Sequence, residues 1–357
     1  MTKKVLHIHH AFILGGVETM VMNIYHHIDR TQLQFDFLIT TPQEIYFKKE
    51  IEQLGGHVFY IVKNRGFINY ICFMIKLYHF LKYNSYNIIQ THFAATGGLD
   101  CLSAKWVGVP KRYMISHGSV KIRIWKRPFF QFFMKYFPTH RLAVSRRAGL
   151  ALYGKLPFKT VKNGIDSARF AFDEKTRRKI RQELDVEGKL VVGNVSRFSK
   201  EKNHSFLLDI FYHIYQKNAL AVLMLIGSGK TESKIKRKAK KLHLEKSVVF
   251  LGERNDCAQL YQAMDCFVFP SKTEGFGIVA IEAQCSGLPC FISDGVPQET
   301  IICNTIQIPL SKSPQEWAQI ILEKIHVYVR KDGADNIKEA GFDIHDTARE
   351  IQEEYLK

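Results

Sequence analysis

The chain has 357 residues, 46% of them hydrophobic, and a net charge of +17, which is enough length for two domains with packed cores. It contains no run of about 18 uncharged apolar residues, so we expect no membrane-spanning helix, and its start, MTKKVLHIHH, predicts no signal peptide. Seven cysteines without a CxxC pair indicate reduced thiols in a cytoplasmic protein, rather than a disulfide framework or a zinc site.

Short β-branched and aromatic runs alternate with helical patterns along the whole chain. In order they are KVLHIHH, FDFLITT, HVFYIV, YNIIQTHF, YMISH, HRLAVS, TVKNGI, KLVVGNVS, AVLMLIGSG, SVVFLGE, CFVFPS, PCFISD and TIQIPL. This alternation predicts βαβ units, and so many strands exceed one ordinary doubly wound sheet. The pattern restarts at Lys189 after a charged segment, so the sequence predicts an α/β protein with two doubly wound domains joined near 166–188. We expect ligands at the carboxyl ends of the strands.

Two short segments follow predicted strands and carry groups suited to phosphate. Gly15 and Gly16 precede a helical pattern, where backbone N–H groups can approach a phosphate closely; the alternative is an ordinary strand–helix turn. Arg197 and Lys202 lie on the loop after the first strand of the second half and could clamp a diphosphate, or else form a solvated surface pair.

The segment IGSGKT at 226–231 resembles two phosphate-binding motifs but matches neither. A P-loop would need glycine where Met224 stands, and a dinucleotide fingerprint would need glycine where Glu232 stands. A glycine turn near a nucleotide remains open.

The segment PSKTEGFGIVAIEAQCSGLP at 270–289 places two acids around a glycine-rich turn. A buried strand ends at its start, and a short helix follows the turn and stops at the next glycine and proline. The helix N-terminus suits a phosphate. Because an ionised carboxylate accepts two hydroxyl donors, Glu282 could hold a ribose diol and Glu274 the hydroxyls of a sugar.

Taken together, these segments resemble the retaining nucleotide-sugar glycosyltransferases of family 4, which have the two-domain GT-B architecture. The matching segments are GGVET (15–19), SHG (116–118), NGID (163–166), SRFSKEKN (196–203) and EGFGIVAIEA (274–283). The opening of the chain looks most like the branch that builds bacterial exopolysaccharides and capsules. The resemblance implies an acceptor-side Rossmann-like domain at 1–168, a nucleotide-sugar domain at 169–336, and a helix at 337–357 that crosses back to the first domain.

The resemblance also assigns roles to individual residues. The implied donor-binding residues are Gly15, Gly16, Gly275, Phe276, Gly277, Ile278 and Glu282. Among them, the glycine pair lines the phosphate site, Glu282 binds the ribose, and the backbone of Phe276 and Gly277 contacts the sugar.

The implied catalytic residues are His117, Arg197, Lys202 and Glu274. The two cations neutralise the leaving diphosphate, the glutamate contacts the transferred sugar, and the histidine stabilises the transition state from the acceptor side. The alternative for His117 is a structural histidine at a strand end. His92 ends the preceding strand and is a candidate for the same side, whereas His9 and His10 carry a weaker signal.

The expected reaction is transfer of a hexosyl unit, with retention, from a nucleoside-diphosphate sugar such as a UDP-sugar to a lipid-linked saccharide. No D-x-D sequence is present to hold a metal ion against the diphosphate, so we expect neither metal nor cofactor. Two alternatives are a nucleotide-sugar epimerase of the same architecture and a non-enzymatic nucleic-acid-binding protein. The epimerase would need further acid or base groups, and a nucleic-acid partner is not expected because no recognition motif is present.

The positive charge is concentrated in the first half of the chain. Residues 1–170 hold 24 Lys and Arg against 8 Asp and Glu, or +16, and the remainder holds 27 against 26, or +1. The segment VKIRIWKRPFFQFFMKYF at 120–137 interleaves five Lys or Arg with seven aromatic residues. Such a mixture suits an anionic membrane surface, although a partly buried helix with solvated cations is the alternative. We therefore expect a peripheral protein on the inner face of the plasma membrane.

Overall fold

The computed structural model describes residues 2–12, 15–42, 45–62, 67–118 and 127–357. Contacts divide the chain into two units. Unit 1 comprises Met1–Gly164 and Ile344–Lys357, and unit 2 comprises Ile165–Asp343.

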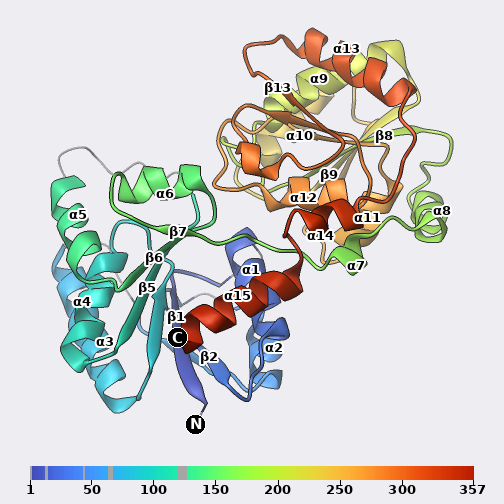
Figure 1. Ribbon diagram of the computed structural model, residues 1–357. Helices are drawn as coiled ribbons and strands as arrows, with labels where there is room; N and C mark the ends of the chain where they lie inside the picture. The colour runs from blue at the N-terminus through green and yellow to red at the C-terminus, as the bar shows by residue number, and fades with distance from the viewer. Residues whose placement is uncertain (1, 13–14, 43–44, 63–66, 119–126) are drawn as a thin grey trace. The chain divides into compact units, whose positions relative to one another are not determined.

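Unit 1 is built on a parallel sheet with the strand order β3-β2-β1-β4-β5-β6-β7 (Figure 1). Its strands are β1 (Lys3–His9), β2 (Leu33–Ile39), β3 (Val58–Tyr60), β4 (Ile88–Thr91), β5 (Lys111–Ser116), β6 (His140–Ala143) and β7 (Lys159–Thr160). The last five residues of β1 are all buried, because helices cover both faces of the sheet. This explains why the strands read as continuous apolar runs.

The helices of unit 1 form a layer on each face of its sheet. They are α1 (Gly16–His27), α2 (Lys48–Gln53), α3 (Phe67–Tyr83), α4 (Gly97–Val107), α5 (Arg127–Tyr136), α6 (Arg146–Tyr153) and α15 (Ile344–Leu356). In Figure 1, α3, α4 and α5 lie on one side of the sheet, and α1, α2 and α15 lie on the other. The last helix of the chain therefore completes the core of unit 1, where the Tyr355 ring packs against those of Phe35 and Tyr113.

Unit 2 contains a second parallel sheet, with the order β10-β9-β8-β11-β12-β13. Its strands are β8 (Leu190–Val195), β9 (Ala221–Ile226), β10 (Val248–Gly252), β11 (Cys266–Phe269), β12 (Cys290–Ser293) and β13 (Thr305–Ile308). Its helices are α7 (Ser167–Phe170), α8 (Glu174–Glu183), α9 (His204–Lys217), α10 (Glu232–Lys241), α11 (Cys257–Ala263), α12 (Ile278–Cys285), α13 (Pro314–His326) and α14 (Ala334–Glu339).

Local sequence signals set several helix boundaries in unit 2. The charged segment before Lys189 forms α8, whose N-cap Asp173 accepts hydrogen bonds from two backbone N–H groups. A capping box between Ser313 and Glu316 begins α13, and Trp317 of this helix is fully buried in the core.

Two doubly wound parallel sheets confirm the predicted α/β fold class, and each of the thirteen predicted strand segments overlaps a strand. Within the described ranges, no helix combines the length and apolarity that crossing a bilayer requires.

Candidate functional site

The strand order reverses once in each sheet, between β1 and β4 in unit 1 and between β8 and β11 in unit 2. Loops that leave the two strands at such a point turn to opposite faces of the sheet, which leaves a crevice at their carboxyl ends. Four of the predicted site residues lie on segments that follow these four strands. Gly15 follows β1, His92 follows β4, Lys202 follows β8 and Glu274 follows β11.

In unit 2, Lys202 and Glu274 form an ion pair. The Lys202 Nζ donates to both carboxylate oxygens of Glu274, at 2.7 and 2.9 Å, and lies 4.9 Å from the centre of the Phe269 ring. The Glu274 side chain is only 9% exposed. An ammonium group has three N–H donors, so Lys202 can hold this carboxylate and still donate to a ligand anion. Arg197, on the same loop, is exposed.

The turn between Glu274 and α12 has a fixed backbone. The N–H group of Glu274 donates to the carbonyl of Gly295 at 3.0 Å, and Phe276 is buried with its ring 5.6 Å from that of Phe342. Gly277, the N-cap of α12, has a φ of 94°, which strains any residue with a side chain. The positive end of the α12 helix dipole therefore lies close to the ion pair of Lys202 and Glu274.

Glu282, on α12, is partly buried and has a hydroxyl partner from α11. The Tyr261 Oη donates to Glu282 Oε2 at 2.9 Å. Burial raises the pKa of Glu282 to about 7, against the hydrogen bond from Tyr261 and the positive charge of Arg169, which both lower it. At neutral pH this carboxyl group is about half ionised. A ligand that donates hydroxyl groups to it stabilises the ionised form.

The glycines of IGSGKT are required by the fold and need no phosphate-binding motif to explain them. A Cβ on Gly227 would lie 2.3 Å from the carbonyl oxygen of Ser196, and one on Gly229 would lie 2.5 Å from that of Phe198. The two glycines therefore allow the loop after β9 to pass directly against the loop that carries Arg197 and Lys202.

In unit 1, the glycine pair lies at the N-terminus of α1. Gly15 is the N-cap with an extended backbone, and a Cβ added to Gly16 would meet no atom of the described part of the chain within 4 Å. The open space beside Gly16 is compatible with a ligand that approaches the first N–H groups of the helix.

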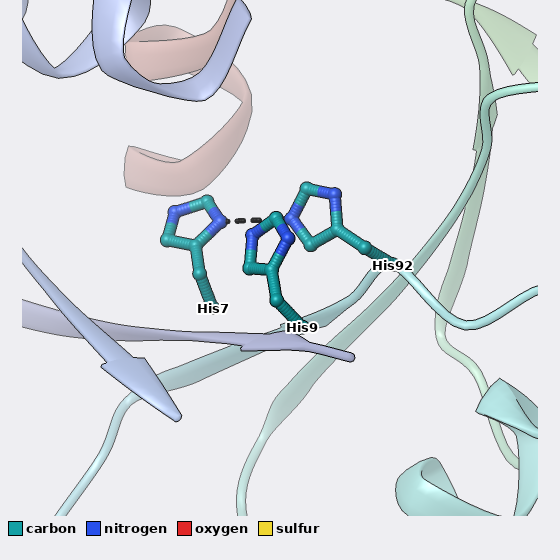
Figure 2. A group of neighbouring side chains, drawn as sticks. All are labelled: His7, His9 and His92. Atoms are coloured by element: carbon teal, nitrogen blue, oxygen red, sulfur yellow. Dashed lines mark hydrogen bonds between the residues drawn. The ribbon is translucent and has the colours of Figure 1, made fainter. Parts of the chain in front are cut away.

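Four histidines of unit 1 gather at the ends of β1, β4 and β5 (Figure 2 shows three of them). The Nδ1 of His7 lies 3.1 Å from Nε2 of His92, and the Nδ1 of His92 lies 2.8 Å from Nε2 of His117. The His9 ring stacks on that of His92, with centroids 3.8 Å apart. Burial lowers the pKa of His7 to about 3 and that of His117 to about 4, so these rings are neutral at pH 7.

Comparison with known proteins places the chain among sugar transferases. The family model for glycosyltransferase family 4 matches residues 14–169, and that for glycosyl transferases group 1 matches residues 176–336. A putative glycosyltransferase, EpsF of Bacillus subtilis (strain 168), is 32% identical over 343 residues, which covers 89% of this chain and 87% of that protein. The chain belongs to glycosyltransferase family 4.

Two further proteins are similar to this family 4 glycosyltransferase. The UDP-Gal:alpha-D-GlcNAc-diphosphoundecaprenol alpha-1,3-galactosyltransferase of Escherichia coli is 25% identical over 82% of this chain and 79% of its own. The crystal structure of Anabaena Alr3699/HepE in complex with UDP superposes with a TM-score of 0.82 at 21% identity, covering 99% of both chains. The latter likeness supports the GT-B fold.

The sequence predicted site residues of this glycosyltransferase but did not predict how they contact one another. It proposed Lys202 and Glu274 as separate ligands of phosphate and sugar, whereas they contact each other. It did not identify Tyr261, the partner of Glu282, or the role of His7 beside His92. A tyrosine on a preceding helix carries no motif that could have revealed it.

Proposed function

We propose that the enzyme transfers a hexosyl unit from a UDP-sugar to a lipid-linked saccharide, with retention of anomeric configuration, during exopolysaccharide or capsule synthesis. The ion pair of Lys202 with the buried Glu274, beside the N-terminus of α12, carries this proposal. It offers a cation and a helix dipole for a diphosphate and a fixed carboxylate for sugar hydroxyls. The UDP complex of HepE and the diphosphoundecaprenol acceptor named for the E. coli relative support the donor and acceptor classes.

In the proposed reaction, the bond between the anomeric carbon and the diphosphate breaks, and positive charge develops on the sugar ring. Lys202 and Arg197 stabilise the negative charge that gathers on the leaving diphosphate. The carboxylate of Glu274 and the backbone of Phe276 and Gly277 hold the sugar, and Glu282 holds the ribose. The leaving phosphate accepts the proton of the acceptor hydroxyl, so no protein base is assigned.

The phosphate end of the donor is proposed to meet the glycine pair of α1, and the sugar is proposed to meet His117. Because Lys202, Arg197 and the N-terminus of α12 supply positive charge at the diphosphate, the proposed reaction does not use a metal ion.

The acceptor side is proposed to face an anionic membrane through an aromatic surface on α4 and α5, which we define as Trp106, Phe129, Phe132, Lys135 and Tyr136. The four aromatic residues are between 46% and 60% exposed, and α4 contacts α5. The Lys135 Nζ lies 4.9 Å from the centre of the Tyr136 ring. Aromatic rings beside cations suit the headgroup region of a bilayer. The basic residues at 120–126 lie outside the described part of the chain.

The reaction is tested with radiolabelled UDP-, GDP- and ADP-sugars and an undecaprenyl-diphosphate-linked saccharide. We expect transfer from a UDP-sugar and an α-linked product from an α-configured donor. Release of an epimerised sugar without transfer would support the epimerase instead, and an inverted product would refute retention. Lys202→Ala should abolish most of the turnover in the same assay.

Membrane association is tested by sedimentation with anionic and neutral vesicles. The double variant Phe132→Ser/Tyr136→Ser should lose binding to anionic vesicles yet keep activity on a water-soluble acceptor. The matched control is Val327→Ser/Val329→Ser, which removes two side chains of unit 2 that are each 74% exposed. Equal binding by both variants would show that the aromatic surface is not the membrane contact.

A further inference from the structure

The four clustered histidines are joined to the last helix of the chain by a glutamine and a tyrosine. The Oη of Tyr355, on α15, donates to Oε1 of Gln90 at 2.5 Å, and Nε2 of Gln90 lies 3.4 Å from Nε2 of His92. Tyr355 and Gln90 are 1% and 4% exposed. The amide oxygen of Gln90 thus accepts from Tyr355, and its NH₂ group faces His92.

The orientation of this amide has a consequence for His92. A neutral imidazole carries one proton, so one ring nitrogen donates and the other accepts. With an NH₂ group directed at its Nε2, His92 must accept there and carry its proton on Nδ1. That Nδ1–H then donates to Nε2 of His117, 2.8 Å away. As a result, His117 carries its own proton on Nδ1.

The contacts of His7 independently favour the same tautomer of His92. The Nε2 of His7 is buried and finds no hydrogen-bond partner among the described residues, while its Nδ1 lies 3.1 Å from Nε2 of His92. A buried N–H group without an acceptor is rarer and more costly than a buried lone pair without a donor. The favoured tautomer therefore places the proton of His7 on Nδ1, where it donates to the same nitrogen of His92.

We infer that Gln90 and Tyr355 are positioning residues that fix the tautomer of His117 through His92, so that His117 presents an Nδ1–H donor to the transferred sugar. This inference rests on the proposed function only for the contact between His117 and the sugar. The tautomer itself follows from the contacts within unit 1.

The same histidines could instead suggest a metal site, since ligand atoms of His7, His9 and His92 lie within 4.8 Å of one another. The ring arrangement argues against this. The lone pairs of an imidazole lie in the plane of the ring, and the planes of His9 and His92 are stacked 21° from parallel with centroids 3.8 Å apart. Two stacked rings present faces to each other and cannot direct their lone pairs at one ion without rearrangement.

The tautomer is measured by ¹⁵N-histidine labelling and long-range ¹H–¹⁵N correlation, with His117 assigned from a His117→Asn sample. The wild type should show a protonated Nδ1 and a bare Nε2 for His117 at pH 7.

Tyr355→Phe, which releases the amide of Gln90, should give a mixture of His117 tautomers. It should also lower kcat at least several-fold with little change in the donor KM. The matched control is Tyr113→Phe, which removes a 2.9 Å hydrogen bond from its hydroxyl to the carbonyl of Glu354 on the same helix.

A purely structural role would make the two tyrosine variants behave alike, with similar loss of thermal stability and the Nδ1–H tautomer retained. That outcome would overturn the inference, as would a wild-type His117 protonated on Nε2. Stoichiometric Zn²⁺ binding that shifts the ¹⁵N signals of His7, His9 and His92 would show a metal site in place of the proposed series of hydrogen bonds. If His117→Asn keeps full turnover while the tautomers behave as stated, the proposed role of His117 in transfer fails and the positioning chain stands.

Discussion

Replacing Glu282 by glutamine should stabilise the folded protein without ligand while weakening donor binding. Burial raises the pKa of this carboxyl group from 4.5 to about 7. The folded state therefore holds a proton that the unfolded chain releases between pH 4.5 and 7. Across this range the unfolded state binds fewer protons, so the ionising carboxyl group lowers the free energy of unfolding as pH rises.

The magnitude follows from the size of the pKa shift. At about 1.36 kcal/mol per pKa unit, a rise from 4.5 to about 7 corresponds to a loss of roughly 3 kcal/mol above pH 7. An uncharged amide avoids this loss and can still accept the hydrogen bond from Tyr261. Glu282→Gln should therefore unfold with nearly the wild-type free energy at pH 4.5 and should be more stable by up to roughly 3 kcal/mol at pH 8.

The assay is denaturant unfolding followed at several pH values with and without UDP. Glu316→Gln is the control of opposite sign, because hydrogen bonds from Ser313 and Lys312 lower the pKa of Glu316 to about 2. That carboxylate stabilises the fold above pH 4.5, and its contribution is lost as the pH falls through about 2, so the glutamine variant should be less stable at pH 8. UDP should stabilise wild type more than Glu282→Gln. Equal stability of wild type and Glu282→Gln at pH 8, or unchanged UDP affinity, would refute this reasoning.

Three further predictions concern the same site. Tyr261→Phe removes a hydrogen bond that lowers the pKa of Glu282, so the calorimetric affinity for UDP should reach its plateau at a higher pH than in wild type; an unmoved pH dependence would contradict the proposed ribose contact. Lys202→Ala and Arg197→Ala should each lower kcat by about 10²–10³, and Lys202→Ala should also lower the melting temperature because it leaves the carboxylate of Glu274 buried without a partner. EDTA should leave turnover unchanged, and loss of activity that Mn²⁺ restores would disprove the metal-independent reaction.

The sequence by itself determined the strands and their grouping. Parallel strands covered on both faces consist of continuous apolar runs, such as AVLMLI in β9, so the pattern is visible without knowledge of the partners. The sequence also revealed local structure where a backbone conformation requires a particular residue type. Gly277 stands at a φ of 94°, and the segment around it was identified as the turn before a short helix. The resemblance to family 4 rested on these same local segments.

Only the tertiary structure decided which side chains meet. Lys202 and Glu274 are 72 residues apart, and Gln90 and Tyr355 are 265 apart, yet each pair is in contact. Hydropathy patterns record whether a side chain is buried, but the register of parallel strands and the packing of helices on them determine what it faces. The pKa of Glu282 also depends on the tertiary structure, because burial raises it while a hydrogen bond from Tyr261 on α11 lowers it.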